Sequence, residues 1–456
     1  MTALLRRPWF IALAAVLVPL GVVVAVNAFD QEYAPAARAF FTRPPVAFVQ
    51  GSGWALLAGF HAPPGEEPRA YGAALHRASL RRKPGTAIQG VAPPLEVRAP
   101  TELLCAPQEM DCVRAFAQRP DSIADLVSDN AVLLARYDDL LRSRGLTDVF
   151  EVFDYYEAIL PHFNTVLRAQ QIRHSAVGAD VAAGRPAEAL AWLEADAAFH
   201  RLWLEEAGSI LTKMLAVRTL SRDFLLAGQV ARSGQALEPA QWDALERTVA
   251  PLTLAQRGVA HVLRIEATLF AILLDRMIAD SRTTSRIIES SRLGSSVASA
   301  LMQRNATLNF AHPVFASWTT LDAVPSHELA RAIERLEEQE RANLAVDWTW
   351  VYNFAGKGLV SEQKPQLAEY LYRVRDLDAL ASVIRCAIEL RRQAVTREAA
   401  APHVAQSPAC IDPYEGVPLG WDDARGELSY KARSPKQVSR FGGRDGRVTF
   451  AVFPAS

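Results

Sequence analysis

Hydrophobic residues recur every three to four positions from about residue 121 to residue 400. This spacing places them on one face of an α-helix, which turns once every 3.6 residues. No stretch in this region alternates with the period of two that is typical of a half-buried strand. The pattern predicts a mainly α fold of antiparallel helical pairs or a bundle. The clearest apolar stripes are Phe153, Tyr156, Leu160, Phe163 and Leu167; Leu190, Leu193, Ala197 and Leu204; Val259 to Ile278; Leu329, Ile333 and Leu336; and Leu377 to Leu390.

The first helix of this region has signals at both ends. Ser122 is suited to be its N-cap residue, with Asp125 three positions later, and Gly145 is suited to end it. We therefore expect one helix between Ser122 and Gly145. Its apolar stripe consists of Ile123, Leu126, Leu133, Tyr137 and Leu141.

The chain begins with an apolar run from Pro8 to Phe29 that contains no charged residue. A helix of this length can cross a hydrocarbon core of roughly 30 Å. Arg6 and Arg7 precede the run, and basic residues stay on the cytoplasmic side, so residues 30–456 are expected in the bacterial periplasm. The alternative is a cleaved signal peptide, with a small-residue cleavage site at 26–28. The run exceeds the apolar region of about 7–15 residues that is usual in signal peptides, which favours an uncleaved inner-membrane anchor.

The segment after the apolar run is predicted to contain short helices and a linker. Glu66 and Glu67 precede Pro68, and acids and a proline are favoured where a helix begins. That helix is expected to end near Leu80, before a stretch rich in proline and glycine at 84–100. The expected layout has four parts. They are a cytoplasmic stub with the transmembrane anchor at 1–29, a membrane-proximal segment at 30–100, a helical domain at 101–400 and a C-terminal tail at 401–456.

The tail carries a β pattern. Pro418–Trp421 and Glu427–Tyr430 flank the turn sequence DDARG, as the strands of a hairpin would, and VTFAVF at 448–453 is rich in β-forming residues. Residues 401–409 are expected to be a linker. The run D-P-x-x-G-x-P-L that begins at Asp412 resembles the C-terminal segment of type II secretion pseudopilins. Because the pilin N-terminal signature is absent, this resemblance implies a small β element and no pilus function.

A second short resemblance lies in the helical region. GRPAEALAWLEADAAFHR at 184–201 resembles about half of one tetratricopeptide repeat, in which a glycine in the first helix is followed by an E-A-L turn into the second. The other marker positions are not filled, and no period of about 34 residues is sustained. The resemblance implies repeat-like antiparallel helical pairs and not an array of this repeat.

The net charge of the chain gives little information about its partners. The 49 basic and 50 acidic residues nearly cancel, so no global field would draw the chain to nucleic acid, and no nucleic-acid partner is expected. Residues 431–447 are locally basic. We interpret them as a solvated loop, with contact to anionic lipid or cell-wall polymer as the alternative.

Four cysteines in a chain exposed to an oxidising compartment suggest disulfides. Four cysteines allow three pairings, and the sequence does not choose between them. Local pairing is the simplest expectation, with Cys105 bonded to Cys112 and Cys386 bonded to Cys410. Four free buried thiols are the alternative.

His200 is the first candidate for chemistry. It lies on the stripe around Leu193 and Leu204, with Asp196 one helical turn earlier, and the pair could orient an imidazole for proton transfer or binding. A buried histidine bonded to its neighbour is favoured, because no third partner is visible. The histidines form no metal motif such as H-E-x-x-H, so neither a metal nor another cofactor is expected.

Glu266 is the second candidate, because it lies in the apolar stretch HVLRIEATLFAILL and a buried carboxylate must be paired or neutral. Lys213, Arg218 or Arg222 on the preceding helix could be its cation partner, and a structural ion pair is favoured over a catalytic acid. Asp154 and Glu157, with His162 beyond them, could offer a metal-ligand set, although this is the weakest of the candidates.

The general pattern consists of one apolar span, G-F-x-A-P-x-G-E-x-P from Gly59, a cysteine pair and then long helices. It resembles uncharacterised single-pass membrane-anchored periplasmic helical proteins of proteobacteria, and the resemblance implies no activity. The expected function is a membrane-anchored periplasmic scaffold or adaptor that binds another cell-envelope protein. The alternative is an envelope enzyme with a site between helices near His200 and Glu266.

Overall fold

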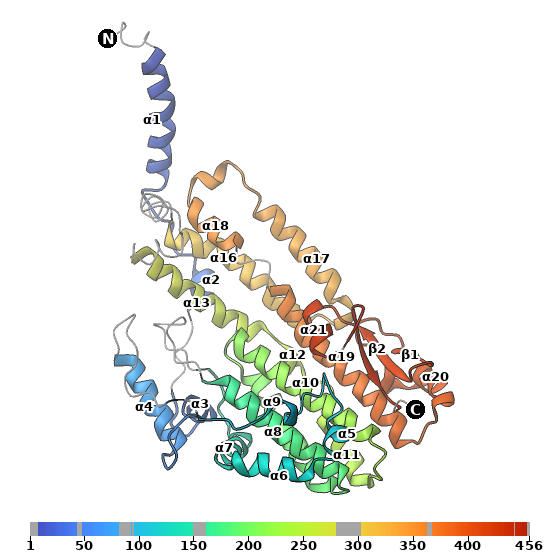
Figure 1. The fold of residues 1–456 in the computed structure, drawn as a ribbon. Helices are drawn as coiled ribbons and strands as arrows, with labels where there is room; N and C mark the ends of the chain where they lie inside the picture. Colours follow the sequence, from blue (N-terminus) through green and yellow to red (C-terminus); the bar gives the residue numbers. More distant parts are fainter. Residues whose placement is uncertain are drawn as a thin grey trace. The chain divides into compact units, whose positions relative to one another are not determined.

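The computed structural model describes residues 8–42, 48–81, 93, 95–148, 161–279, 302–362, 367–441 and 443–453. The fold is mainly helical, with a three-stranded antiparallel sheet near the C-terminus, as predicted (Figure 1). Within these described ranges, none of the helices combines the length and apolarity needed to cross a membrane. The apolar run forms helix α1 (Pro8–Val26), and the chain leaves the helix before the predicted end at Phe29.

The remaining elements follow α1 in chain order. The helices are α2 (Pro35–Phe41), α3 (Gly53–Ala58), α4 (Pro68–Arg81), α5 (Cys112–Phe116), α6 (Pro120–Asp129), α7 (Ala131–Leu141), α8 (Phe163–Ala182), α9 (Pro186–Glu206), α10 (Ile210–Arg232), α11 (Pro239–Thr248), α12 (Leu254–Arg257), α13 (Ala260–Ala279), α16 (Arg304–Thr319), α17 (Ser326–Asn343), α18 (Phe354–Glu362), α19 (Leu367–Arg392), α20 (Arg397–Gln406) and α21 (Pro435–Arg440). The short 3₁₀ helices are η1 (Thr101–Leu103), η2 (Thr320–Ala323), η3 (Trp348–Val351) and η5 (Pro408–Cys410), and the strands are β1 (Gly420–Asp422), β2 (Glu427–Lys431) and β3 (Arg447–Ala451).

The chain divides into two compact units, each assembled from separated stretches. The predicted helical domain at 101–400 contributes to both of them. The first unit comprises Met1–Pro44, Leu263–Leu321 and Ala330–Ala368, and the second comprises Pro45–Val262, Asp322–Leu329 and Glu369–Ser456.

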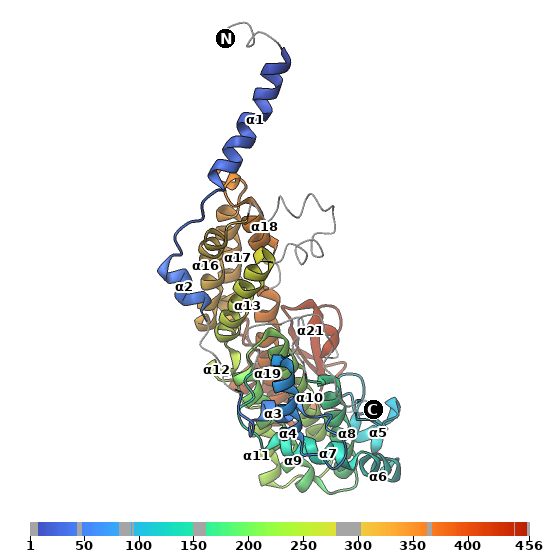
Figure 2. The same cartoon turned by 90° about the vertical axis from the view of Figure 1, so that its left-hand side faces the viewer.

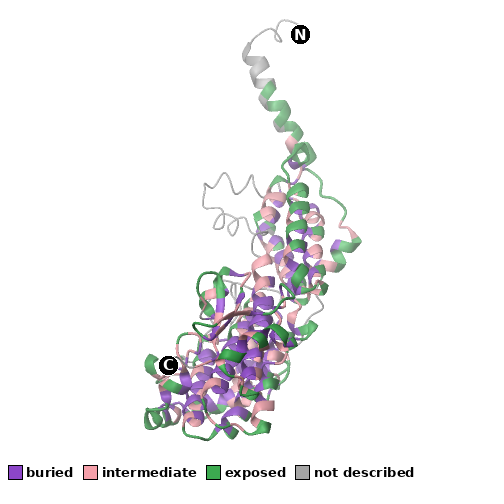
Figure 3. Cartoon of the chain, turned by 90° about the vertical axis from the view of Figure 1, so that its right-hand side faces the viewer, coloured by how far each residue is buried: buried purple, intermediate pink, exposed green. Residues whose placement is uncertain are grey.

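Helices α8, α9 and α10 form the core of the second unit, where each packs against the other two. Gly184, with φ +77°, provides the left-handed turn between α8 and α9, and Pro186 then begins α9. Ser209 caps α10, because its hydroxyl accepts from the Thr212 amide while the Thr212 hydroxyl accepts from the Ser209 amide. These signals produce the predicted antiparallel pairs, whose buried positions are coloured purple in Figure 3.

Several predicted helices have nearly the predicted bounds, and one does not. The expected helices at 68–80 and 259–278 correspond to α4 and α13. The expected helix from Ser122 to Gly145 is wrong in its start, its continuity and its end. Helix α6 begins earlier, at Pro120, the helical run breaks at Asn130, and α7 follows and ends at Leu141, before Gly145. Asn130 Nδ2 donates to the carbonyl oxygens of Arg98 and Leu126. These side-chain hydrogen bonds favour the end of α6 at this position over a continued helix.

The first unit has its own apolar core and a polar junction at the end of α1. Its helices α2 and α18 both pack against α16, and the three can be located in Figure 2. Phe41 of α2 packs against Phe315 of α16, and Phe270 of α13 contacts the same ring. Asn27 makes the junction, because its side chain donates to Val351 O and accepts from Asn353 N, both at 2.8 Å. The segment after α1 is thus bound to the loop at 351–353.

The C-terminal sheet has the order β1-β2-β3, with Trp421 opposite Leu428 and Leu428 opposite Phe450. The predicted hairpin and third strand are confirmed, and Gly426 (φ +65°) lies in the DDARG turn. Asp376 of α19 fixes the region that follows β2, because its carboxylate accepts from the amides of Arg433 and Ser434 at 3.0 and 2.8 Å.

Two expectations for the tail are wrong. Residues 401–409 are not a linker, because α20 and η5 occupy most of them. Thr396 precedes α20 in extended conformation, and Pro402 does not prevent the helix from reaching Gln406. The basic stretch 431–447 is not one loop, because it contains α21, which begins at Pro435.

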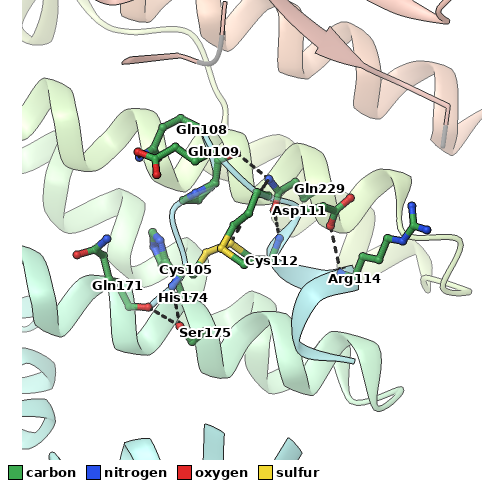
Figure 4. Close-up of a disulfide and its surroundings, with 12 residues drawn as sticks. Cys105, Gln108, Glu109, Asp111, Cys112, Arg114, Gln171, His174, Ser175 and Gln229 are labelled. Atoms are coloured by element: carbon green, nitrogen blue, oxygen red, sulfur yellow. Dashed lines mark hydrogen bonds between the residues drawn. A yellow bond between two sulfur atoms is a disulfide. The ribbon is translucent and has the colours of Figure 1, made fainter. Parts of the chain in front are cut away.

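Both expected disulfides are present, and no free cysteine occurs among the four. Cys105 is bonded to Cys112 with a Cα–Cα distance of 5.6 Å, and Cys386 to Cys410 with 4.8 Å. The first closes a short loop against α8 (Figure 4). Gly178 allows this approach, since a Cβ there would lie 2.8 Å from Cys112 O.

We expect each disulfide to stabilise the fold. Replacing Cys386 and Cys410 together by alanine should cost about 3 kcal/mol in the free energy of unfolding, and the pair Cys105 and Cys112 somewhat less because its loop is shorter. Urea unfolding of the full chain in detergent would measure both costs. Labelling of thiols in the denatured, unreduced protein is the control, and any labelled cysteine would contradict the pairing.

Candidate functional site

Four ionisable side chains from three helices meet inside the second unit. His174 comes from α8, Asp196 and His200 from α9, and Asp223 from α10, and all four are 0% exposed. We call these four residues the polar cluster. It forms because each residue occupies a core position of its helix, among leucine, phenylalanine and alanine neighbours.

Asp223 is the common partner in the polar cluster. Its Oδ1 lies 3.0 Å from His174 Nε2, and its Oδ2 lies 2.7 Å from His200 Nδ1. His174 Nε2 also lies 3.2 Å from Asp196 Oδ2. His200 and Asp196, the predicted pair on one helix, have a longer contact of 3.8 Å. The missing third partner of that pair is therefore Asp223.

Two neutral side chains complete the surroundings of the polar cluster. The Tyr137 hydroxyl, from α7, donates to Asp196 Oδ1 at 2.7 Å and lies 3.4 Å from His200 Nε2. Gln170 Nε2, from α8, donates to Asp223 Oδ1 at 3.0 Å and to Thr219 O at 3.1 Å. Each carboxylate oxygen of the cluster thus has a hydrogen-bond partner, as a buried charge requires.

The electrostatics of the two carboxyl groups differ. Burial and then the charge of Asp196 raise the pKa of Asp223 well above its usual value. Burial also opposes ionisation of Asp196, but His200 and His174 more than offset it and lower the pKa of that carboxyl. Burial lowers the pKa of His200. For His174 the same burial is outweighed by hydrogen bonds to Asp196 and Asp223, and its pKa is raised.

These directions favour a particular distribution of protons. The directions favour an ionised Asp196 and disfavour a second ionised carboxyl group at Asp223, so the two carboxyl groups and the two imidazoles share their protons as one coupled cluster. A cluster with no net charge is compatible with complete burial, whereas two unbalanced carboxylates are not.

The same atoms could also hold a metal ion. One ligand atom each from His174, Asp196 and Asp223 lie within 4.8 Å of one another. Imidazole nitrogen and carboxylate oxygen are suitable ligands for a divalent cation such as Zn²⁺. His174 Nδ1, however, is buried without a hydrogen-bond partner in the described structure, whereas metal-bound histidines normally donate from their second nitrogen. The residues therefore fit an internal ion-pair network better than a metal site.

The other predicted site residues do not join the polar cluster. Lys213 is buried, and its ammonium donates to Leu204 O at 2.6 Å and to Gln256 O at 2.9 Å. Burial lowers the pKa of Lys213 to about 8. Glu266 is half-buried on α13 and belongs to the first unit. Lys213 thus bonds the end of α9 to α12.

The last candidate ligand set falls largely outside the described residues, since Asp154 and Glu157 lie there. His162 precedes α8, and its ring contacts that of His61 at a centroid distance of 3.7 Å.

Sequence reasoning missed His174, Asp223, Tyr137 and Gln170. One signal was available: Asp223 lies between Leu220 and the apolar run FLLA, at a position where the helical pattern calls for a core residue. A polar residue at a core position must find a buried partner. Its partners could not be identified, because they come from other helices.

Comparison of the chain with protein-family models, with curated proteins and with solved structures found no match.

We expect Asp223 to stabilise the second unit. Replacing it by alanine leaves His200 Nδ1 and Gln170 Nε2 without this acceptor and should cost on the order of 3–5 kcal/mol in the free energy of unfolding. Asp223→Asn should cost roughly 1–3 kcal/mol, because the amide keeps one acceptor. Urea unfolding of the full chain would measure both.

Asp243→Ala is the matched control for this experiment. Asp243 pairs with Arg392 at 2.8 Å with about half of its side chain exposed, so its loss should cost less than about 1 kcal/mol. An Asp223→Ala variant that is as stable as Asp243→Ala would contradict the structural role of the polar cluster.

Proposed function

We propose that this chain is a helical scaffold or adaptor, anchored in the bacterial inner membrane by Pro8–Phe29, which presents a periplasmic body to another cell-envelope protein. The observation that carries the proposal is a set of exposed apolar side chains on the chain after α1 and on the segment at 346–354 that is hydrogen-bonded to it, which we call the patch. The patch consists of Phe29, Val346, Trp348, Val351 and Phe354. Such a patch next to a charge-free helix is suited to the boundary between lipid and water.

The patch is strongly exposed. Trp348 is 84% exposed and Phe29 is 81% exposed, although both are large apolar side chains that normally avoid water. Large exposed apolar side chains on neighbouring segments are typical of a surface that contacts a membrane or another protein. The apolar side chains Leu17, Val18, Val22 and Val24 of α1 are also exposed, and they extend the apolar surface along the helix.

The loop that carries Trp348 is held in place from several sides. Asp347 Oδ1 accepts from the Thr349 amide at 2.8 Å, and Lys357 Nζ donates to Thr349 O at 2.8 Å. The Tyr352 hydroxyl donates to Phe29 O at 3.3 Å. Together with the bonds of Asn27, these contacts fix the patch to the chain that leaves α1. The patch would therefore follow α1 to the membrane surface as one piece.

Two further features support the periplasmic location and a scaffold function rather than an enzyme. Two buried disulfides suit the oxidising periplasm. The polar cluster, which contains His200 and Asp196, is fully enclosed and internally paired. The alternative of an envelope enzyme near His200 and Glu266 draws less support, because a substrate has no access to an enclosed cluster. A pull-down from detergent-solubilised membranes would identify the envelope partner.

The proposal predicts the topology. An alkaline phosphatase fused after Ser456 should be active, since Arg6 and Arg7 keep the N-terminus in the cytoplasm. A green fluorescent protein at the same position, exported through the general secretory route, should not fluoresce. Fluorescence of that fusion would contradict both the periplasmic body and the anchor orientation.

The proposal also predicts that Trp348 contacts lipid. In the full chain reconstituted into vesicles, brominated lipids should quench part of the tryptophan fluorescence, and Trp348→Phe should remove part of that quenching. Trp318→Phe is the control, because Trp318 is buried and should contribute none. Equal quenching in the wild type and in Trp348→Phe would contradict the placement of the patch at the membrane.

A further inference from the structure

A buried arginine of the second unit is attracted by the carboxylates of Asp223 and Glu109 but makes no close contact with either in the described part of the chain. Arg222 on α10 is only 4% exposed, and the hydrogen bond recorded for its guanidinium is a long one of 3.5 Å to Gln170 Oε1. In the described part of the chain no ion pair involves Arg222. A buried cation is costly unless a counter-charge lies against it. Asp223 and Glu109 attract Arg222 without a close contact, so an anion that contacts the guanidinium directly would stabilise it further.

Arg222 lines two neighbouring cavities. One has a volume of about 480 Å³ and is also lined by Arg168 of α8 and Arg218 of α10. The other has a volume of about 340 Å³ and is lined by Arg218, Arg222 and Arg440 of α21. We call the two cavities together the arginine cleft. Its size is in the range of sites for small ligands, which is roughly 300–1,000 Å³.

The charge in the arginine cleft is strongly one-sided. Arg168, Arg218 and Arg440 are exposed, and none of the ion pairs in the described structure includes them. Burial and then the charge of Arg218 lower the pKa of Arg222. Glu109 is the acidic residue among those lining both cavities. Four guanidinium groups against one carboxylate leave a net positive site.

The Cys105–Cys112 loop forms a fixed wall of the arginine cleft. It carries Gln108 and Glu109, which line both cavities and extend from the loop in Figure 4. Gln229 Nε2 donates to the carbonyl oxygens of Pro107 and Met110, both at 2.8 Å, and the disulfide closes the loop. The wall is therefore built before any ligand arrives, which lowers the entropic cost of binding.

We propose that the arginine cleft binds a phosphate-bearing anion through Arg218 and Arg222, with Arg168 and Arg440 at its sides. Phosphate is favoured over a carboxylate because guanidinium groups approach from three different helices, and a phosphate group has acceptor oxygens in several directions. A carboxylate satisfies one planar guanidinium in its own plane. This inference does not depend on the membrane anchor or on the scaffold function.

The test is titration calorimetry on the full chain in dodecyl maltoside micelles at low ionic strength. Inorganic phosphate and soluble dihexanoyl phosphatidylglycerol are the two probes, and they separate a free phosphate from a lipid headgroup. At least one should bind with one site per chain. Arg218→Gln should weaken that binding about tenfold, and Glu109→Gln should strengthen it. Acetate should bind more weakly than phosphate.

Arg114→Gln is the matched control. Arg114 is exposed on α5, at the other end of the disulfide loop in Figure 4, and lines neither cavity. Because Arg218 and Glu109 are exposed, their glutamine variants should fold, and circular dichroism would verify this for each. Failure of both probes to bind, equal binding by Arg218→Gln and the wild type, or acetate binding as tight as phosphate would overturn the proposal.

Discussion

The second unit depends on the buried carboxyl group of Asp223. This group on α10 contacts His174 of α8 and His200 of α9 and therefore connects three helices in their common core. Apolar contacts alone would stabilise many relative rotations of these helices, because hydrophobic burial is non-directional. Hydrogen bonds with fixed partners select one arrangement. Tyr137 extends the constraint to a fourth helix, α7, through Asp196.

Buried polar side chains also fix non-helical segments against helices elsewhere in the chain. Asp376 of α19 binds the amides of Arg433 and Ser434, and its carbonyl oxygen accepts from the Tyr430 hydroxyl at 2.8 Å. In the first unit, Asn27 serves the chain after α1 in the same way. Buried polar side chains thus determine where the connecting segments lie, while the helices contribute most of the apolar surface that is buried in the core.

The sequence predicted those features that depend on neighbours along the chain. The period of three to four residues indicated the helices, the turn residues before Gly426 indicated the hairpin, and short separations indicated both cysteine pairs. Prediction failed where a tertiary contact determines where a helix ends or which side chains meet. Asn130 breaks a continuous apolar stripe because its side chain bonds to Arg98 O. The partners of His200 come from other helices and leave no local trace.

The candidate site also depends on contacts between residues far apart in the chain, which the sequence alone does not reveal. Asp196 lies one helical turn from His200, so the pair could be recognised, but its geometry is poor at 3.8 Å. The stronger contact, from His200 to Asp223, joins positions 23 residues apart in the chain. The arginine cleft likewise combines residues of α8, α10 and α21, whose side chains only the folded chain brings together.

The central claim is that the polar cluster joins α7, α8, α9 and α10 into one cooperative unit. Hydrogen–deuterium exchange of the full chain, followed peptide by peptide in the wild type and in Asp223→Asn, tests it most directly. We predict that peptides from all four helices lose protection together, by a similar factor, while peptides from α13 and α16 of the first unit keep theirs. Loss of protection confined to the part of α10 around position 223 would contradict the claim.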